Sequence, residues 1–190
     1  MSAQAARSVA DIFAMNLVAE LDRHCERGLD RINAFVRFNR QVEGWFKGEL
    51  LMIAADMVRN GLVADFTPDC RMGSASKVNI DLRFMLTNGR AVWIELKHWY
   101  IGRYPSGGVW NATTYCTQTT SAAPSNFLAK LPAEWPDPTY LLAVATPKPN
   151  EADWQMGVQR LKARQPHRRF GALTKPSDFP SEYFLALLRV

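Results

Sequence analysis

One stretch, residues 77–97, constrains the fold more than any other part of the chain. Two runs of alternating apolar residues flank the tripeptide Thr87-Asn88-Gly89, and this arrangement predicts a β-hairpin. Because successive strand residues point to opposite faces, Glu95 and Lys97 share one face of the second strand. Whether Asp81, on the first strand, joins them depends on the length of the turn.

The turn length fixes which residues of the two strands lie opposite each other. A two-residue loop at residues 88–89 would pair Asp81 with Leu96 and mix a carboxylate with core residues. A three-residue loop at residues 87–89 pairs Asp81 with Glu95 instead. The apolar pattern favours the three-residue loop, because a slip by one residue would bury charges.

With this register, one face of the hairpin is apolar and the other carries Asp81, Glu95 and Lys97. The apolar face consists of Ile80, Leu82, Phe84, Val92, Ile94 and Leu96. Gly89 also suits the left-handed position that a three-residue loop requires. Two adjacent carboxylates repel each other unless a cation joins them, and their oxygens are hard ligands suited to Mg²⁺ or Mn²⁺.

Composition indicates an ordinary globular chain. With 190 residues, 47% hydrophobic and 22% charged, it fits one domain that can bury a core. The net charge of +5 is compatible with a nucleic-acid partner but does not establish one. The three cysteines have no metal-binding spacing, and neither a signal-peptide core nor an apolar run of membrane-spanning length is present. We expect a cytoplasmic protein with reduced thiols and no membrane partner.

The remaining periodicities predict an α/β domain. Apolar residues at helical spacing predict helices over residues 8–26, 29–38, 41–60 and 151–165, with a weaker signal within 112–131. Strands are expected at residues 62–71, where Pro68 breaks the pattern, and at the apolar runs 139–146 and 184–189. Strands separated by helices imply a sheet covered on both sides. Residues 1–40 are expected to form a helical extension of the domain at 41–190, the two together being compact.

The helix expected over residues 41–60 offers two carboxylates to a site beside the sheet. Glu43 lies near the centre of its apolar stripe, and Glu49 lies at the flank, one residue before Leu50. A lone helical Glu is more often solvated or paired on the surface than turned into a site.

The segment after Lys97 is rich in glycine, aromatic and basic residues, and loops of this kind beside a strand often contact substrate. Tyr104 and Trp110 can stack on bases, and Arg103 can bind a phosphate. Trp99 is expected in the core, and His98 alternates to the apolar face as a hydrogen-bonded core residue.

Taken together, these features resemble the PD-(D/E)xK nuclease superfamily, which has the restriction-endonuclease-like fold. The resemblance rests on Asp81 at a strand, a gap of thirteen residues and then Glu95-Leu96-Lys97 on the next strand. A helix with a carboxylate precedes this motif, and a helix and an apolar strand follow it, so that the resemblance covers roughly residues 41–146. The proline that the family often has before the Asp is absent, since Ile80 stands there.

The resemblance implies a three-layer core, with a central mixed β-sheet flanked by helices, and a role for each motif residue. Asp81 and Glu95 would ligate a divalent metal, Mg²⁺ or Mn²⁺, with the Leu96 carbonyl as a further ligand. Lys97 would orient the attacking water or help to deprotonate it.

The resemblance also implies a helical Glu that ligates a second metal or holds a metal-bound water. Glu49 is favoured for this role, because its spacing to the helix-ending Gly61 resembles that of family members. Glu43 is the alternative.

The function expected from this resemblance is a metal-dependent endonuclease that hydrolyses phosphodiester bonds, in DNA in preference to RNA, in a defence or mobile-element context. A bound metal lowers the pKa of water and neutralises charge on the phosphate, which this hydrolysis requires. The alternative is a catalytically silent module of the same fold that binds nucleic acid or a protein partner. The helices within residues 1–40 would then provide the surface for a homodimer or a partner protein.

Overall fold

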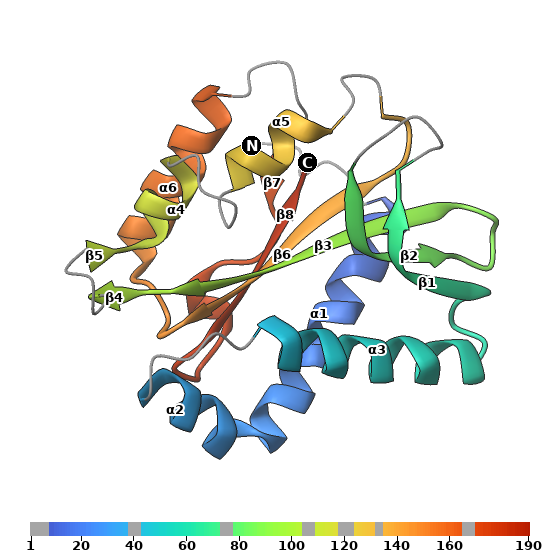
Figure 1. The fold of residues 1–190 in the computed structure, drawn as a ribbon, viewed down its shortest axis with the longest axis horizontal. Helices are drawn as coiled ribbons and strands as arrows, with labels where there is room; N and C mark the ends of the chain where they lie inside the picture. Colours follow the sequence, from blue (N-terminus) through green and yellow to red (C-terminus); the bar gives the residue numbers. More distant parts are fainter. Residues whose placement is uncertain are drawn as a thin grey trace, which may run out of the picture.

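A six-stranded mixed sheet runs through the middle of the structure, with helices on both faces (Figure 1). The computed structural model describes residues 8–37, 43–72, 78–103, 109–117, 124–131, 135–164 and 170–190. The strand order is β1-β2-β3-β6-β8-β7. The α/β class expected from the sequence is therefore confirmed.

The strands of the main sheet are β1 (Asp65–Arg71), β2 (Asn79–Met85), β3 (Ala91–Tyr100), β6 (Thr139–Thr146), β7 (Gly171–Ala172) and β8 (Phe184–Arg189). A separate ribbon consists of β4 (Gly102–Arg103) and β5 (Val109–Trp110). The helices are α1 (Val9–Arg27), α2 (Leu29–Arg37), α3 (Glu43–Arg59), α4 (Ala112–Thr117), α5 (Pro124–Lys130) and α6 (Glu151–Arg164), with a 3₁₀ turn η1 (Pro176–Asp178). Within these described parts, no helix is long and apolar enough to cross a membrane.

The β2–β3 hairpin has the predicted register. Leu82 pairs with Ile94, and Phe84 pairs with Val92. The Leu86 amide donates to the carbonyl of Arg90 at 2.9 Å, which closes a three-residue loop. Gly89 has φ +79°, the left-handed conformation that the loop was expected to need.

One face of the sheet packs on α1 and α3. The six apolar hairpin residues named above are each at most 1% exposed, which confirms the predicted apolar face. Phe84 meets Phe13 of α1 edge to face, with ring centroids 5.0 Å apart. The buried residues of α1 belong to the same hydrophobic core as those of the sheet.

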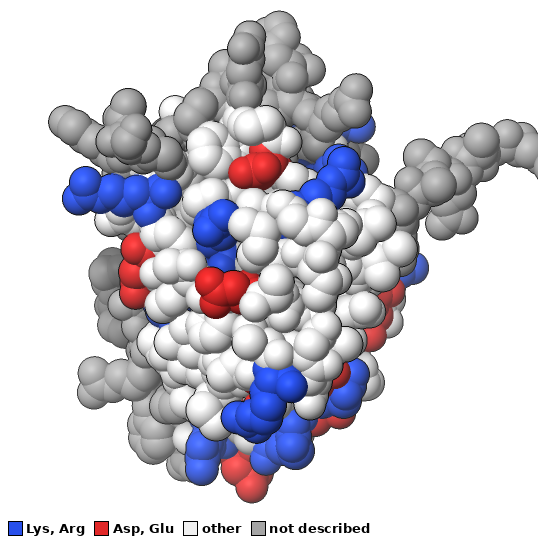
Figure 2. Space-filling view, turned by 90° about the vertical axis from the view of Figure 1, so that its right-hand side faces the viewer, with Lys and Arg blue, Asp and Glu red and all other residues white. Residues whose placement is uncertain are grey.

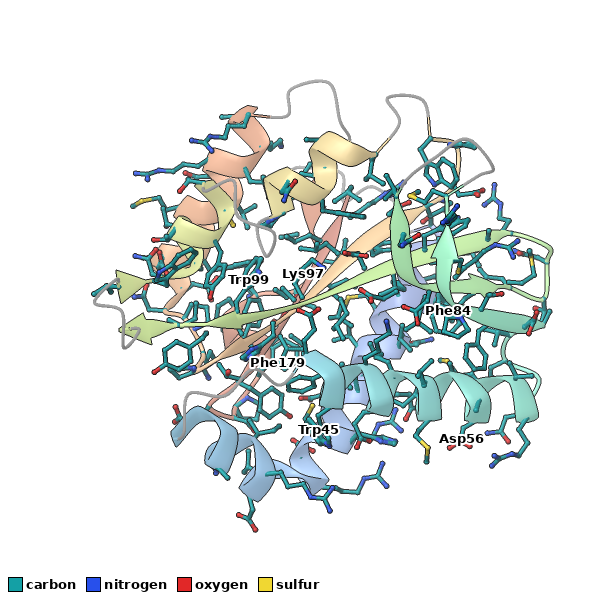
Figure 3. All side chains as sticks on the ribbon, viewed as in Figure 1. Trp45, Asp56, Phe84, Lys97, Trp99 and Phe179 are labelled. Atoms are coloured by element: carbon teal, nitrogen blue, oxygen red, sulfur yellow. The ribbon has the colours of Figure 1, made fainter. Side chains whose placement is uncertain are left out.

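The other face of the sheet packs on α4 and α6. Trp99 of β3 is fully buried there, stacked on Tyr115 of α4 at 5.3 Å and 6.3 Å from Trp154 of α6. Figure 3 shows Lys97 next to Trp99 along β3, whereas Phe84 lies in the part of the sheet that covers α1 and α3. The core position expected for Trp99 is confirmed.

β3 and β6 run parallel in the centre of the sheet, and all eight residues of β6 are buried. The chain reaches β6 from β3 by way of α4 and α5. The continuous apolar run at residues 139–146 thus marks a strand covered on both faces, as expected for a parallel central strand.

One expectation for the local structure was wrong. Pro68 does not break β1, because β1 is an edge strand, and a proline at an edge removes no obligatory ladder hydrogen bond. The helical signal within residues 112–131 is confirmed, and it corresponds to two short helices, α4 and α5. The short strand β7, at Gly171–Ala172, has no apolar pattern from which it could have been predicted.

Two glycine substitutions should change stability in opposite directions. Gly89 and Gly48 both have open space around an added Cβ, but Gly89 is left-handed and Gly48 lies within α3. Gly89→Ala should lower the free energy of unfolding by roughly 1–2 kcal/mol. Gly48→Ala should raise it by about 0.5–1 kcal/mol. Urea unfolding of the two variants checks this, and equal effects would contradict the hairpin geometry.

Candidate active site

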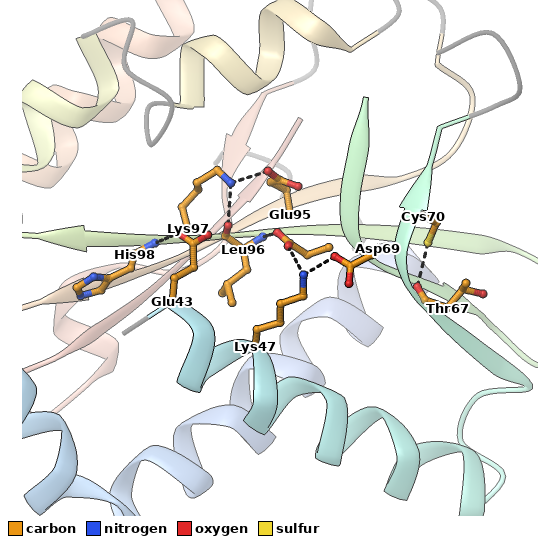
Figure 4. Close-up of polar contacts among 10 residues, drawn as sticks. Glu43, Lys47, Thr67, Asp69, Cys70, Glu95, Leu96, Lys97 and His98 are labelled. Atoms are coloured by element: carbon orange, nitrogen blue, oxygen red, sulfur yellow. Dashed lines mark hydrogen bonds and ion pairs between the residues drawn. The ribbon is translucent and has the colours of Figure 1, made fainter. Parts of the chain in front are cut away.

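The candidate site lies where β2 separates from β3 (Figure 4). Ile94 is the last residue of β3 that pairs with β2, while β3 continues beside β6 as far as Tyr100. Beyond Ile94, side-chain carboxylates take the place of β2. The Leu96 amide donates to Asp81 at 2.8 Å, and the His98 amide donates to Glu43 of α3 at 3.2 Å.

The same edge of β3 presents a carbonyl oxygen to the site. The amide and carbonyl of one strand residue point to the same edge, so the Leu96 carbonyl lies on the side from which β2 has departed. It accepts a hydrogen bond from Lys97 Nζ at 3.0 Å. Asp81 and Leu96 therefore both direct oxygen atoms toward the point where the strands separate.

Glu95 and Lys97 form a largely buried ion pair on the face that covers α4 to α6. Lys97 Nζ lies 2.5 Å from Glu95 Oε1, and the two side chains are 14% and 11% exposed respectively. Burial raises the pKa of Glu95 to about 7, and the negative charge of Asp81 adds to this against the opposing effect of Lys97. Burial thus favours the protonated form of Glu95 more than water does.

The third part of the site is a lysine from α3 that spans two strands. Lys47 Nζ lies 3.0 Å from Asp81 Oδ1 and also pairs with Asp69 of β1. Burial disfavours the charged form of Lys47, but its hydrogen bonds to Asp69 and Asp81 outweigh burial and raise its pKa. Lys47 is therefore held as a cation between two carboxylates.

Three carboxylates occupy the same level of three adjacent strands. The β1–β2 register pairs Pro68 with Leu82 and Cys70 with Ile80, which places Asp69 opposite Asp81. Asp81 and Glu95 come directly after the last β2–β3 pair, Leu82 with Ile94, and are close enough for the charge of Asp81 to raise the pKa of Glu95. We call Asp69, Asp81 and Glu95 the acid row. Like charges in such positions destabilise a sheet unless cations lie among them, as Lys47 and Lys97 do here.

Lys47 and Asp69 were not predicted from the sequence. Lys47 follows Glu43 by four residues, so both lie on one face of α3, and this spacing was a usable signal. Asp69 could have been found only by extending the strand pairing through Pro68. Asp69 itself has φ +49°, a left-handed conformation rare in a strand.

Glu49 does not belong to this group, and the preference for it over Glu43 requires correction. Glu49 Oε2 lies 2.9 Å from His24 Nδ1 of α1, on another face of α3. Six residues rotate an α-helix by about 600°, so Glu49 points about 120° away from Glu43. Glu43 is the helical carboxylate that reaches β3.

The three residues expected to bind substrate are only partly described. Tyr104 lies outside the described residues, and of Arg103 only the main chain is described, paired with Val109 in the β4–β5 ribbon. The Trp110 ring lies 5.0 Å from that of Tyr115. Trp110 thus packs against Tyr115, whose ring also stacks on Trp99, and the Trp110 ring contacts protein instead of standing open for a base to stack on.

His98 is a core residue, as expected. It is 7% exposed, and its Nε2 lies 2.7 Å from the Thr146 hydroxyl. Burial lowers its pKa to about 4, so the imidazole is neutral at neutral pH. A group that is uncharged and enclosed in this way has no part in the acid row.

Hard oxygen donors are the only ligand chemistry that the described part of the site offers to a metal. Asp81, Glu95 and the Leu96 carbonyl fit Mg²⁺ or Mn²⁺, which commonly bind one or two carboxylates together with water and phosphate oxygens. Among the described residues there is no group of three or more His, Cys, Asp and Glu side chains that could hold a metal. The protein donors are therefore few, and an ion held by them would complete its coordination with water.

Charges on one side of the molecule are mixed. Figure 2 shows Lys and Arg interspersed with Asp and Glu, separated by uncharged surface, on the side that carries the hairpin turn. A continuous basic surface, which would attract a phosphate backbone from a distance, is not seen on this face.

The chain matches no protein-family model, no curated protein and no solved structure. Fold and site geometry are therefore the two observations from which a function can be inferred.

The raised pKa of Glu95 predicts a pH-dependent contribution to stability. The contribution is fully present below the ordinary pKa of 4.5 and is lost as the pH rises through about 7, because ionisation of buried Glu95 opposes folding. Relative to Glu95→Gln, the wild-type free energy of unfolding should fall by about 1–3 kcal/mol between pH 4.5 and 7.5. Denaturant unfolding across this range checks it, and a constant difference between the two proteins would contradict it.

Proposed function

We propose that the protein is a metal-dependent nuclease that hydrolyses phosphodiester bonds and belongs to the PD-(D/E)xK superfamily. The observation that carries the proposal is the convergence of Asp81, Glu95, Lys97 and the Leu96 carbonyl where β2 leaves β3. The motif spacing in the sequence alone is a weak signal. Its weight comes from the hairpin register, which brings the motif residues to one level of the sheet.

The fold supports the same proposal. A helix that offers Glu43 precedes the hairpin, and β3 continues through a helical crossover into the parallel strand β6. Helices cover both faces of the mixed sheet. This order of elements is the one implied by a restriction-endonuclease-like core.

The side chains are placed to hold reactants near one point. A divalent ion bound at Asp81, Glu95 and the Leu96 carbonyl would lower the pKa of water and offset charge on a phosphate. Lys97 Nζ, between Glu95 and the Leu96 carbonyl, is positioned to donate a hydrogen bond to the attacking water or to a phosphate oxygen. The Leu96 amide fixes Asp81 Oδ2 and so sets the direction of its other oxygen.

Glu43 acts at the edge of the site. Its carboxylate accepts the His98 amide, which keeps β3 extended after β2 has departed, and lies one helical turn from Lys47. In the proposed site it holds a metal-bound water. The net charge of +5 favours a polyanionic substrate, and DNA is the substrate we propose in preference to RNA.

Cleavage of plasmid DNA and of a structured RNA with Mg²⁺ or Mn²⁺ tests the proposal. Wild type should cut, EDTA should abolish cutting, and Asp81→Asn, Glu95→Gln and Lys97→Met should each lower the rate by about 10²-fold or more. Equal cutting by wild type and Lys97→Met, or none by wild type at high enzyme concentration, would overturn it.

Two glutamates of α3 provide a matched comparison. Glu43→Gln should reduce cleavage by about tenfold or more, since Glu43 adjoins β3, whereas Glu49→Gln should stay within about twofold of wild type. Both variants remove one negative charge from the same helix. A greater loss in Glu49→Gln would restore the assignment that the sequence alone favoured.

One observation favours a second candidate, a catalytically silent module that binds nucleic acid or protein. Asp81 and Glu95 are already paired with Lys47 and Lys97, so the site is stabilised without a metal. This candidate predicts binding that survives both EDTA and Asp81→Asn, measured by mobility shift with DNA. Loss of all binding on removal of metal would count against it.

A further inference from the structure

Lys47 occupies the position at Asp81 that an external cation would take. Its ammonium lies 3.0 Å from Asp81 Oδ1, while the other carboxylate oxygen of Asp81 is held by the Leu96 amide. One carboxylate thus has both oxygens engaged, one by the main chain and one by Lys47. The Lys47 side chain is 25% exposed, so it has room to move at the surface of the site.

A second carboxylate holds Lys47 at the same time as Asp81. Asp69 pairs with Lys47, lies across from Asp81 in the β1–β2 register, and has a side chain that is 71% exposed. Asp69 is separated from Glu95 by the whole width of β2. Lys47 can therefore leave Asp81 without leaving the acid row, because Asp69 already holds its ammonium.

We propose that Lys47 is an internal cation that competes with the divalent metal for Asp81, with Asp69 as the partner that retains it on displacement. This inference rests on the proposed function, since it takes Asp81 as a metal ligand. In the metal-free protein Lys47 offsets the charge of Asp81 and keeps β1, β2 and α3 together. Metal binding breaks the pair with Asp81 and leaves Lys47 on Asp69 alone, with its ammonium beside the site and within reach of a phosphate oxygen.

The competition lowers metal affinity in the absence of substrate. A divalent ion that approaches Asp81 must displace a bound ammonium and accept a positive charge nearby, and both effects oppose binding. A phosphate that binds next to the ion would attract the displaced Lys47 and offset part of this cost. Metal and nucleic acid should therefore bind with positive coupling.

Titration of the full chain with Mn²⁺ by calorimetry, without nucleic acid, tests the inference. Lys47→Met should bind Mn²⁺ about tenfold or more tightly than wild type, because the competing charge is gone. Arg59→Met is the matched control. Arg59 is also on α3 and also pairs with an aspartate, Asp56, but lies about 18 Å along the helix from Lys47. The affinity of Arg59→Met for Mn²⁺ should stay within about twofold of wild type.

A double-mutant cycle separates competition from a general loss of charge. Asp69→Asn should weaken Mn²⁺ binding, because displaced Lys47 then has no partner, and this effect should shrink in the Lys47→Met background. Asp65 is an exposed aspartate of the same strand, and Asp65→Asn measures the effect on Mn²⁺ binding of removing one negative charge from β1. If Lys47→Met does not fold, the comparison of Asp69→Asn with Asp65→Asn still decides, and equal effects of the two would overturn the inference.

The outcomes distinguish this inference from the proposed function. Mn²⁺ binding by wild type that is unchanged or weakened in Lys47→Met would overturn the role of Lys47 and leave the metal-dependent function in place. No Mn²⁺ binding by either wild type or Lys47→Met would overturn both. Tighter binding by Lys47→Met, with Arg59→Met unchanged, supports both.

Discussion

The separation of β2 from β3 is the constraint on which the rest of the site depends. A strand that loses its neighbour leaves amides and carbonyls unpaired, and burying them without partners is costly. Here the Asp81 carboxylate accepts a hydrogen bond from the Leu96 amide, and the Glu43 carboxylate accepts one from the His98 amide. The hydrogen bonds that complete the strand thus also bring carboxylates from β2 and α3 to one edge of β3. The need to pair the amides of β3 therefore also explains why the carboxylates of Asp81 and Glu43 gather at this edge.

Charge balance is the second consequence of this arrangement. The acid row places Asp69, Asp81 and Glu95 at one level of three strands, which would repel without nearby cations. Lys47 and Lys97 lie among them from different elements, one from α3 and one from β3 itself. Burial still raises the pKa of Glu95 to about 7, so the positive charge of Lys97 does not fully offset the effect of burial on this carboxylate. The pairing of Asp81 and Glu95 with lysines agrees with a metal-free binding module, and the oxygen donors agree with the proposed nuclease.

The hairpin could be predicted from the sequence because its information is local. Alternation, a Thr-Asn-Gly turn and the cost of burying charge select one register, and the structure has that register. Strands β6 and β8 were predicted for the same reason, as continuous apolar runs. The spacing to Glu43 places Lys47 on the same face of α3, but the contact of Lys47 with Asp69 depends on how α3 packs against β1, which no local pattern encodes. The choice between Glu43 and Glu49 was a question of helix rotation, and the apolar stripe of α3 pointed to Glu43.

A crystal structure of the protein with Mn²⁺ tests directly whether a metal binds where β2 leaves β3, because anomalous scattering locates the ion without reference to activity. We expect an ion bound by Asp81, Glu95 and the Leu96 carbonyl, with Lys47 separated from Asp81 and still paired with Asp69. No ion at this position at millimolar Mn²⁺, with Lys47 still on Asp81, would contradict this expectation.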